Sequence, residues 1–191
     1  YDPSGNLVRT REGYALMTWK VDAKGNRLEQ NCYDEHRQLI GDKDGIARME
    51  WTYDPAGNKT SEKYFGVDGR PLRYKGMFVA MRFIYDDRGN EIERRYFDAA
   101  GKPTWSGDGS YGTLTQYDGR GNQVRQMFVD AQNKPYARAK GYATIVSTYD
   151  PRNNLKKRTY LDEADKPVLT DSGHASYANE YDSRGRLVRQ H

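Results

Sequence analysis

The sequence predicts an all-β fold: an antiparallel array of β-hairpins in about six units of 32 residues, forming a curled sheet, a solenoid or a partial shell or barrel. Three observations predict it. A turn motif recurs at a fixed interval, glycine recurs at the turn position that requires positive φ, and hydrophobic residues alternate between the turns. The motif reads YDPAGN, YDDRGN, YDGRGN, YDPRNN and YDSRGR, starting at Tyr53, Tyr85, Tyr117, Tyr149 and Tyr181.

Each unit contains two turns of the form D-x-x-G. The second turn follows the first by 12 residues, as in FDAAGKP at Phe97, and the opening YDPSGNL at Tyr1 is in this second phase. Asp favours the first turn position, and the fourth position closes a three-residue hairpin loop in the left-handed conformation. Asn133, Asn153 and Asp165, which replace glycine there, tolerate positive φ. Arg37 breaks the rule, so we expect its turn to be strained or different.

The segments between the turns read as strands. In residues 46–53, Ala47, Met49, Trp51 and Tyr53 share one face, which is typical of a half-buried strand. Residues 59–65 form a second, more polar strand, and a short third stretch leads to a small-residue corner such as the GYA at Gly141. Two firm strands and one short strand per unit give more than ten strands, and twisted sheets of that size usually curl or close.

We expect a single repeat domain over residues 1–191. Its units are in register at about 13–44, 45–76, 77–108, 109–140 and 141–172, with partial units at both ends. Because both chain ends fall within a unit, we expect a fragment of a longer array.

The composition limits the possible functions. Hydrophobic residues make up only 36% of the chain, but 16 Tyr, 5 Phe and 3 Trp argue against disorder. The net charge of +4 comes from interleaved charges, which predicts no specific nucleic-acid partner, and no segment reads as a membrane span. The most basic stretch, residues 154–160, reads as a solvated strand face rather than an anion site.

The sequence gives little support for catalytic or metal-binding residues. His36, His174 and His191 do not recur with a nucleophile and a carboxylate, so we expect no enzyme and no cofactor. Asp42 and Asp44 lie two residues apart, but starting a turn accounts for Asp there, so we expect no metal site. Cys32 has no partner for an intrachain disulfide.

The turn with its preceding Tyr, followed by a polar strand and a second D-x-x-G turn, resembles the YD repeats of bacterial Rhs proteins, which teneurins share. Rhs proteins form spiralling β shells that enclose a toxin or mediate surface contacts. Here the strict 32-residue period, the G-Y-A corner and the G-K-P turn depart from the typical YD unit, which is shorter and less regular. About six units are too few to close a shell, so the resemblance implies only the β-repeat architecture. A more distant similarity is to hairpin-solenoid repeats that bind cell-wall sugars or choline.

Aromatic residues are the best binding candidates. The Tyr before each first turn shares the apolar face and is read as structural. An aromatic row elsewhere could stack on sugars or bind a protein, or could pack against the next unit; it comprises Tyr14, Tyr74, Phe78, Trp105, Tyr136 and Tyr142.

The sequence therefore predicts a non-enzymatic β-repeat scaffold or interaction module from a larger bacterial surface or secreted protein. The alternatives are a repeat module that binds carbohydrate (cell-wall sugars or other glycans) and a shell segment that encloses a toxin domain. The expected partners are a protein or a glycan, with oligomers possible through open strand edges.

Overall fold

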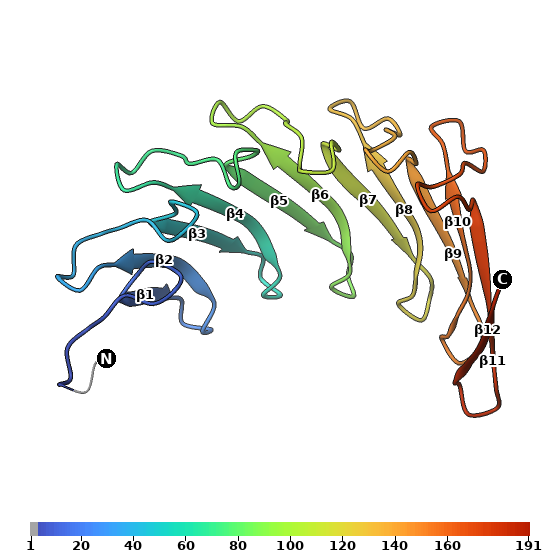
Figure 1. Cartoon of the computed structure of the whole chain (residues 1–191), viewed down its shortest axis with the longest axis horizontal. Coiled ribbons are helices and arrows are strands. Elements are labelled where there is room, and N and C mark those ends of the chain that lie inside the picture. The colour runs from blue at the N-terminus through green and yellow to red at the C-terminus, as the bar shows by residue number, and fades with distance from the viewer. Residues whose placement is uncertain (1–3) are drawn as a thin grey trace. The chain divides into compact units, whose positions relative to one another are not determined.

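The computed structural model describes residues 4–191 and is all-β (Figure 1). The strands are antiparallel, and their hydrogen-bonded order in the sheet is the chain order. Among the described residues, no helix is long and apolar enough to cross a membrane. The strands are β1 (Leu16–Val21), β2 (Arg27–Tyr33), β3 (Arg48–Tyr53), β4 (Lys59–Phe65), β5 (Ala80–Tyr85), β6 (Glu91–Phe97), β7 (Gly112–Tyr117), β8 (Gln123–Val129), β9 (Thr144–Tyr149), β10 (Leu155–Leu161), β11 (Ser176–Tyr181) and β12 (Leu187–Gln190).

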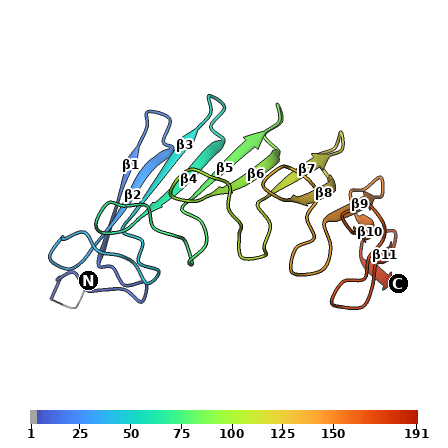
Figure 2. The same ribbon diagram turned by 90° about the horizontal axis from the view of Figure 1, so that it is seen from above.

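The chain divides into two compact parts. The first part runs to Phe83 and includes Arg95–Thr104; the second comprises Ile84–Arg94 and Trp105–His191. In each part the short hairpin turns lie at one end of the strands and the longer connections at the other (Figure 1). The longer connections of each part extend to one side of its strands (Figure 2). The prediction of a single domain stays a prediction.

Strand pairing is long within a hairpin and short between hairpins. In the first part, β3 and β4 pair from Arg48↔Phe65 to Tyr53↔Lys59, whereas β2 and β3 pair only from Glu29↔Glu50 to Asn31↔Arg48. The β3–β4 register shifts at Thr52/Tyr53, as expected for a three-residue hairpin loop with a bulge. The second part repeats this contrast in β7–β8 and β8–β9. The backbone alone therefore joins neighbouring hairpins less extensively than it joins the two strands of one hairpin.

An Asp–Asn pair fixes the first turn in five units, and in the last unit Asp182 bonds Arg186 instead. Asp54 Oδ1 accepts the Asn58 backbone N–H at 2.9 Å, and Asp54 Oδ2 accepts the Asn58 side-chain amide at 3.0 Å. Gly57 then takes φ 91°, which a side chain would strain. The same pair forms at Asp22–Asn26, Asp86–Asn90, Asp118–Asn122 and Asp150–Asn154. The predicted turn is confirmed, and its last Asn has a structural role.

The second turns also adopt the predicted geometry, including the one at Arg37. Arg37 takes φ 61° and donates its N–H to the Asp34 carbonyl at 3.1 Å, and Gly69, Gly101, Asn133 and Asp165 make the same bond in the later second turns. The expected strain is present because a non-glycine residue holds positive φ, but the expectation of a different turn is wrong. The first copy of this turn includes Asp2 and Pro3, which lie outside the described residues.

The small-residue corner is a third turn of the same kind. Gly45 donates its N–H to the Asp42 carbonyl at 2.8 Å, and Asp42 Oδ1 accepts the N–H groups of Asp44 and Ile46. The carboxylate of Asp42 therefore caps a turn. The predicted short third strand is a single bridge, such as Phe65↔Pro71, with one flanking hydrogen bond from Leu72 N–H to the Tyr64 carbonyl.

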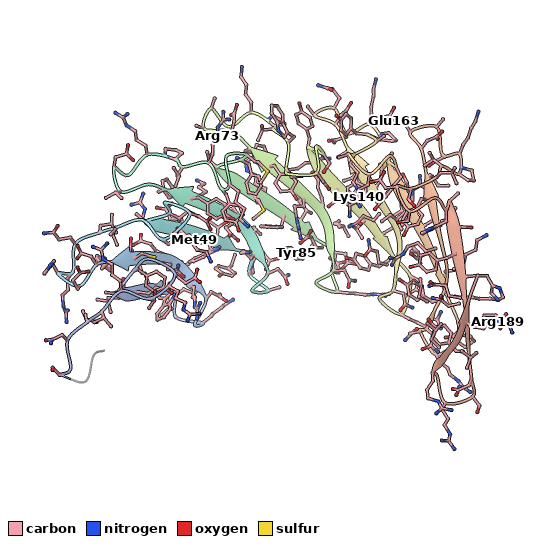
Figure 3. All side chains as sticks on the ribbon, viewed as in Figure 1. Met49, Arg73, Tyr85, Lys140, Glu163 and Arg189 are labelled. Carbon is pink, nitrogen blue, oxygen red and sulfur yellow. The ribbon has the colours of Figure 1, made fainter. Side chains whose placement is uncertain are left out.

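The core of the first part lies where the corners fold over one face of the strands, here called the corner face. Ile46, Tyr64 and Phe78 form its buried centre. Residues from the strands and from the corners surround this centre: Met49, Leu72, Tyr74, Met77, Met81 and Tyr96 (Met49 is labelled in Figure 3). Register places Met49 opposite Tyr64 and Met81 opposite Glu62, so the predicted period of two puts Met49 and Met81 on one face.

Candidate functional site

Two of the six candidate aromatic residues are buried. Phe78 and Tyr142 are only 5% and 6% exposed, because each corner folds its ring onto the strands. Phe78 packs between Tyr64 and Tyr96, with ring centroids 6.1 and 4.8 Å away. These two candidates are therefore not available as an exposed aromatic surface.

Rings of strands and corners alternate along the corner face of the second part. Tyr142, from a corner, contacts Phe128 of β8 at 6.0 Å and Tyr160 of β10 at 4.8 Å between centroids. Tyr160 then contacts His174 of the next corner at 5.9 Å. Aromatic pairs of this kind stabilise by about 0.5–1.5 kcal/mol beyond the area that they bury. The rings therefore serve packing between units, which was the alternative explanation for the aromatic row.

Tyr14 and Tyr74 are half-buried. The Tyr74 ring stacks on Tyr64 with centroids 4.9 Å apart and an interplanar angle of 17°. Lys75 Nζ lies over the Tyr74 ring, 5.3 Å from its centroid. The Tyr74 ring is therefore already contacted by Tyr64 and by Lys75.

Trp105 and Tyr136 remain exposed, at 53% and 37%. Trp105 makes an edge contact with Tyr111 at 6.2 Å, and the Tyr136 ring lies against Gly109 of the same corner. These two residues flank one corner of the second part. They are the candidates that the structure leaves free to meet a partner.

A polar cluster that the sequence did not indicate fills one place in the row of rings. Ser110 stands where other corners carry Ile46, Phe78 or Tyr142, and the Arg138 guanidinium lies over Phe128 and Tyr142, 4.2 and 4.5 Å from their centroids. The missing ring is thus replaced by a cation stacked on two rings.

Arg138 also pairs with a carboxylate. Its Nη1 lies 3.1 Å from Asp108 Oδ2, and Asp108 Oδ1 accepts the hydroxyls of Ser106 at 2.5 Å and Ser110 at 2.8 Å. Burial raises the pKa of Asp108, but the hydrogen bonds from the two serines and from Arg138 outweigh it, so the pKa lies below its usual value. Every oxygen of this carboxylate is engaged, so the cluster is structural rather than a site poised for chemistry.

A second buried carboxylate lies in the first part. Glu62 is 8% exposed, accepts the Tyr64 hydroxyl at 2.6 Å and pairs with Lys59. Burial, and then this hydrogen bond, raise the pKa of Tyr64. The period of two along β4 puts Glu62 on the same face as Thr60 and Tyr64. Nothing in the sequence indicated the partners of its carboxylate.

The Tyr of the first turn bonds one unit to the preceding one. The hydroxyls of Tyr117, Tyr149 and Tyr181 donate to the carbonyls of Glu91, Gln123 and Leu155, at 3.1, 3.1 and 3.0 Å. Each acceptor lies 26 residues earlier and directly follows the preceding first turn. This accounts for Tyr at these three positions, because Phe has no hydroxyl group to donate.

A basic residue in the first turn donates a hydrogen bond to the following unit, in the direction opposite to the Tyr bond. Lys24 Nζ donates to the Pro55 carbonyl at 2.7 Å in the first part. In the second part, Arg88 donates to the Gly119 carbonyl at 2.8 Å and Arg120 to the Asp150 carbonyl at 3.1 Å. Arg152 donates likewise to Ser183. Neighbouring turns are thus joined by charge-assisted hydrogen bonds.

The histidines lie apart from one another. The His36 side chain is 74% exposed beside Glu35, His174 packs among tyrosines, and His191 Nε2 lies 2.9 Å from Glu180. Within residues 4–191, no group of three His, Cys, Asp or Glu side chains is arranged to hold a metal ion. Cys32 is buried, and burial raises the pKa of its thiol.

Comparisons with known proteins give a fold but no family. No family model matches the chain, and no curated protein matches it. A solved structure of a Photorhabdus luminescens Tc holotoxin pore with a TccC3 mutation is similar at a TM-score of 0.50 and 18% identity, over 91% of this chain. A TcdB2–TccC3 structure without its hypervariable C-terminal region is similar at a TM-score of 0.48 and 16% identity, over 93% of this chain. The chain spans only 9% of the length of either structure, so the likeness concerns the fold of one segment.

Proposed function

We propose that this chain is a non-enzymatic β-repeat scaffold of a larger bacterial protein and, more specifically, a segment of a shell wall around a toxin domain. The main support for this proposal is the set of hydrogen bonds that the turn residues make between units. Tyr149 reaches back to Gln123 and Arg152 reaches forward to Ser183, so one turn contacts the units on both sides. The repeated motif is thus used to hold the array together, and a wall requires this cohesion.

Two further findings support the shell. The turns and the preceding Tyr resemble the YD repeats of Rhs proteins, and the chain shares its fold with a segment of a Tc holotoxin pore structure. A place outside the cell or at the bacterial surface is consistent with this function. Strand pairing through open edges would join the segment to further copies or to the rest of its parent.

A carbohydrate-binding module is the second candidate. The exposed Trp105 and Tyr136 favour it, because flat aromatic faces stack on sugar rings. Against it, the candidate rings Phe78 and Tyr142 are buried, and the residues equivalent to Trp105 in the neighbouring units, Arg73 and Ala137, carry no ring. A sugar-binding array would repeat its exposed rings every unit.

Limited proteolysis and a glycan array together test these candidates. A wall segment should resist trypsin despite 31 Lys and Arg residues, and should show no glycan binding that depends on Trp105. The wild-type chain and Trp105→Ala are compared in both assays. Saturable glycan binding that Trp105→Ala abolishes would replace the scaffold by the sugar-binding module, and rapid cleavage in the turns of the native chain would contradict a wall.

A further inference from the structure

The face opposite the corners carries an apolar groove in the first part. The groove has a volume of about 240 Å³, and Phe65, Ala80 and Phe97 are among its lining residues. Val79 N–H donates to the Phe97 carbonyl at 2.9 Å, which sets the start of β5 beside Phe97. The small Ala80 forms the floor, and the two phenylalanines form the walls.

The preceding unit has a longer side chain at this place. Arg48 lies 32 residues before Ala80, and its guanidinium covers Phe65 with Cζ 4.4 Å from the ring centroid. Register pairs Arg48 with Phe65 directly. Where Arg48 has a long side chain, Ala80 has only a methyl group, and this leaves room beside Phe65 and Phe97.

Two cations border the groove. Lys63 pairs with Ala80 across β4 and β5, and Arg82 lies over Phe97 with Cζ 4.5 Å from the centroid. Among the described residues neither cation has a carboxylate within ion-pairing distance, and both are exposed. The carboxylate of Asp98 also lines the groove, but its Oδ1 accepts the N–H groups of Ala100 and Lys102. The rim therefore has two unpaired positive charges beside an apolar floor.

We propose that this groove binds an extended segment of a partner polypeptide. An aromatic or branched apolar side chain enters between Phe65 and Phe97, and a neighbouring carboxylate pairs with Lys63 and Arg82. The volume lies below the roughly 300–1,000 Å³ of pockets that enclose small molecules. It suits one anchoring side chain, as in a protein interface where an apolar anchor enters a pocket and charges select the partner.

The inference rests on the proposed scaffold function, since a wall that encloses another domain must contact it. NMR titration of the ¹⁵N-labelled whole chain tests the groove with three acetylated and amidated pentapeptides. The first, Gly-Glu-Phe-Glu-Gly, carries the anchor and the charge. The others are Gly-Lys-Phe-Lys-Gly, with the opposite charge, and Gly-Glu-Ala-Glu-Gly, without the anchor.

The acidic Phe peptide should shift amides of residues 61–65, 80–82 and 97–101 and bind about tenfold more tightly than either control, the equivalent of about 1.4 kcal/mol. Ala80→Leu should fill the groove and abolish these shifts. Ser176→Leu, at the equivalent position of a later unit, is its matched control and should leave them unchanged. The double variant Lys63→Glu with Arg82→Glu, which changes only exposed side chains, should reverse the preference towards the Lys peptide.

Equal binding of the acidic and basic peptides, shifts located elsewhere, or no shifts at millimolar peptide would overturn the proposal. Tighter binding of dodecanoate at the same amides, or self-association that Ala80→Leu abolishes, would overturn the polypeptide occupant. Trypsin resistance and glycan binding do not depend on the groove. The scaffold and the groove can therefore fail separately.

Discussion

The Tyr117 hydroxyl donates a hydrogen bond to the backbone carbonyl of Glu91 at 3.1 Å, across 26 residues of sequence. Tyr149 and Tyr181 repeat this bond to Gln123 and Leu155. Between hairpins the backbone pairing is short, as between β8 and β9, so the side-chain bond adds to a limited interface. At these three positions the Tyr of the turn motif therefore links its unit to the preceding one.

Replacing this Tyr by Phe should weaken the array. Tyr149→Phe should lower the free energy of unfolding by about 1 kcal/mol, because one partly buried hydrogen bond is lost while the ring remains. Urea denaturation of the whole chain measures it. Tyr53→Phe is the matched control, because Tyr53 makes no side-chain hydrogen bond to another described residue, and it should change stability by only a few tenths. Equal losses in both variants would show that the link contributes nothing.

The turn at Arg37 offers a stabilising substitution. Arg37→Gly should raise the free energy of unfolding by about 1 kcal/mol, because the left-handed conformation at φ 61° disfavours a side chain. Gly101→Ala is the reverse test and should cost a similar amount, since a Cβ there meets no atom within 4 Å and only the φ of 75° opposes it. A destabilised Arg37→Gly variant in urea denaturation would refute the shared geometry.

Removing the Arg138 side chain, which replaces a ring in the aromatic row, should lower the stability of the fold. Arg138→Ala should cost about 2 kcal/mol, because it removes the stacking on Phe128 and Tyr142 and leaves Asp108 without its ion partner. Thermal and urea unfolding measure the loss. Arg184→Ala, at an exposed turn, is the control and should be nearly neutral. The structural role would be wrong if Arg138→Ala matched this control.

The Asp–Asn turns predict a loss of stability in acid. The Asn side-chain amide, followed by backbone N–H groups, lowers the pKa of Asp54, Asp86 and Asp118. Since these folded-state pKa values lie below the unfolded value of about 3.9, the stabilisation is complete above that pH and is lost as the pH falls through the folded values. The melting temperature should therefore be steady from about pH 7 to 5 and fall below about pH 4. Asn58→Ala should reduce this acid dependence, and a flat or rising profile in acid would contradict it.

Local rules predicted the turns and strands because each depends on residues close in sequence. The glycine substitutes Asn133, Asn153 and Asp165 all take positive φ, and β4 spans the predicted residues 59–65. The fate of the corner rings was not predictable in this way. Whether Phe78 faces solvent depends on the side of the sheet onto which the corner folds, and its neighbour Tyr96 lies on another strand.

The candidate site shows the same limit. Trp105 was predicted on the same grounds as Phe78, yet only Trp105 is exposed. The Ala80 groove could not be predicted from the repeat, since residues of β4, β5 and β6 line it and only the fold brings them together. Periodicity describes what the units share and does not show which side chains the fold brings together at one place.

The most direct test of the repeat scaffold is to lengthen it by one unit. Inserting a second copy of residues 141–172 after residue 172 preserves every turn, strand and link, so circular dichroism should show unchanged β content per residue. The melting temperature should equal or exceed that of the wild type, because each added unit contributes its own interface. A scrambled insert of the same composition is the control. Loss of cooperative unfolding with the intact copy, to the extent seen with the scrambled insert, would contradict the account.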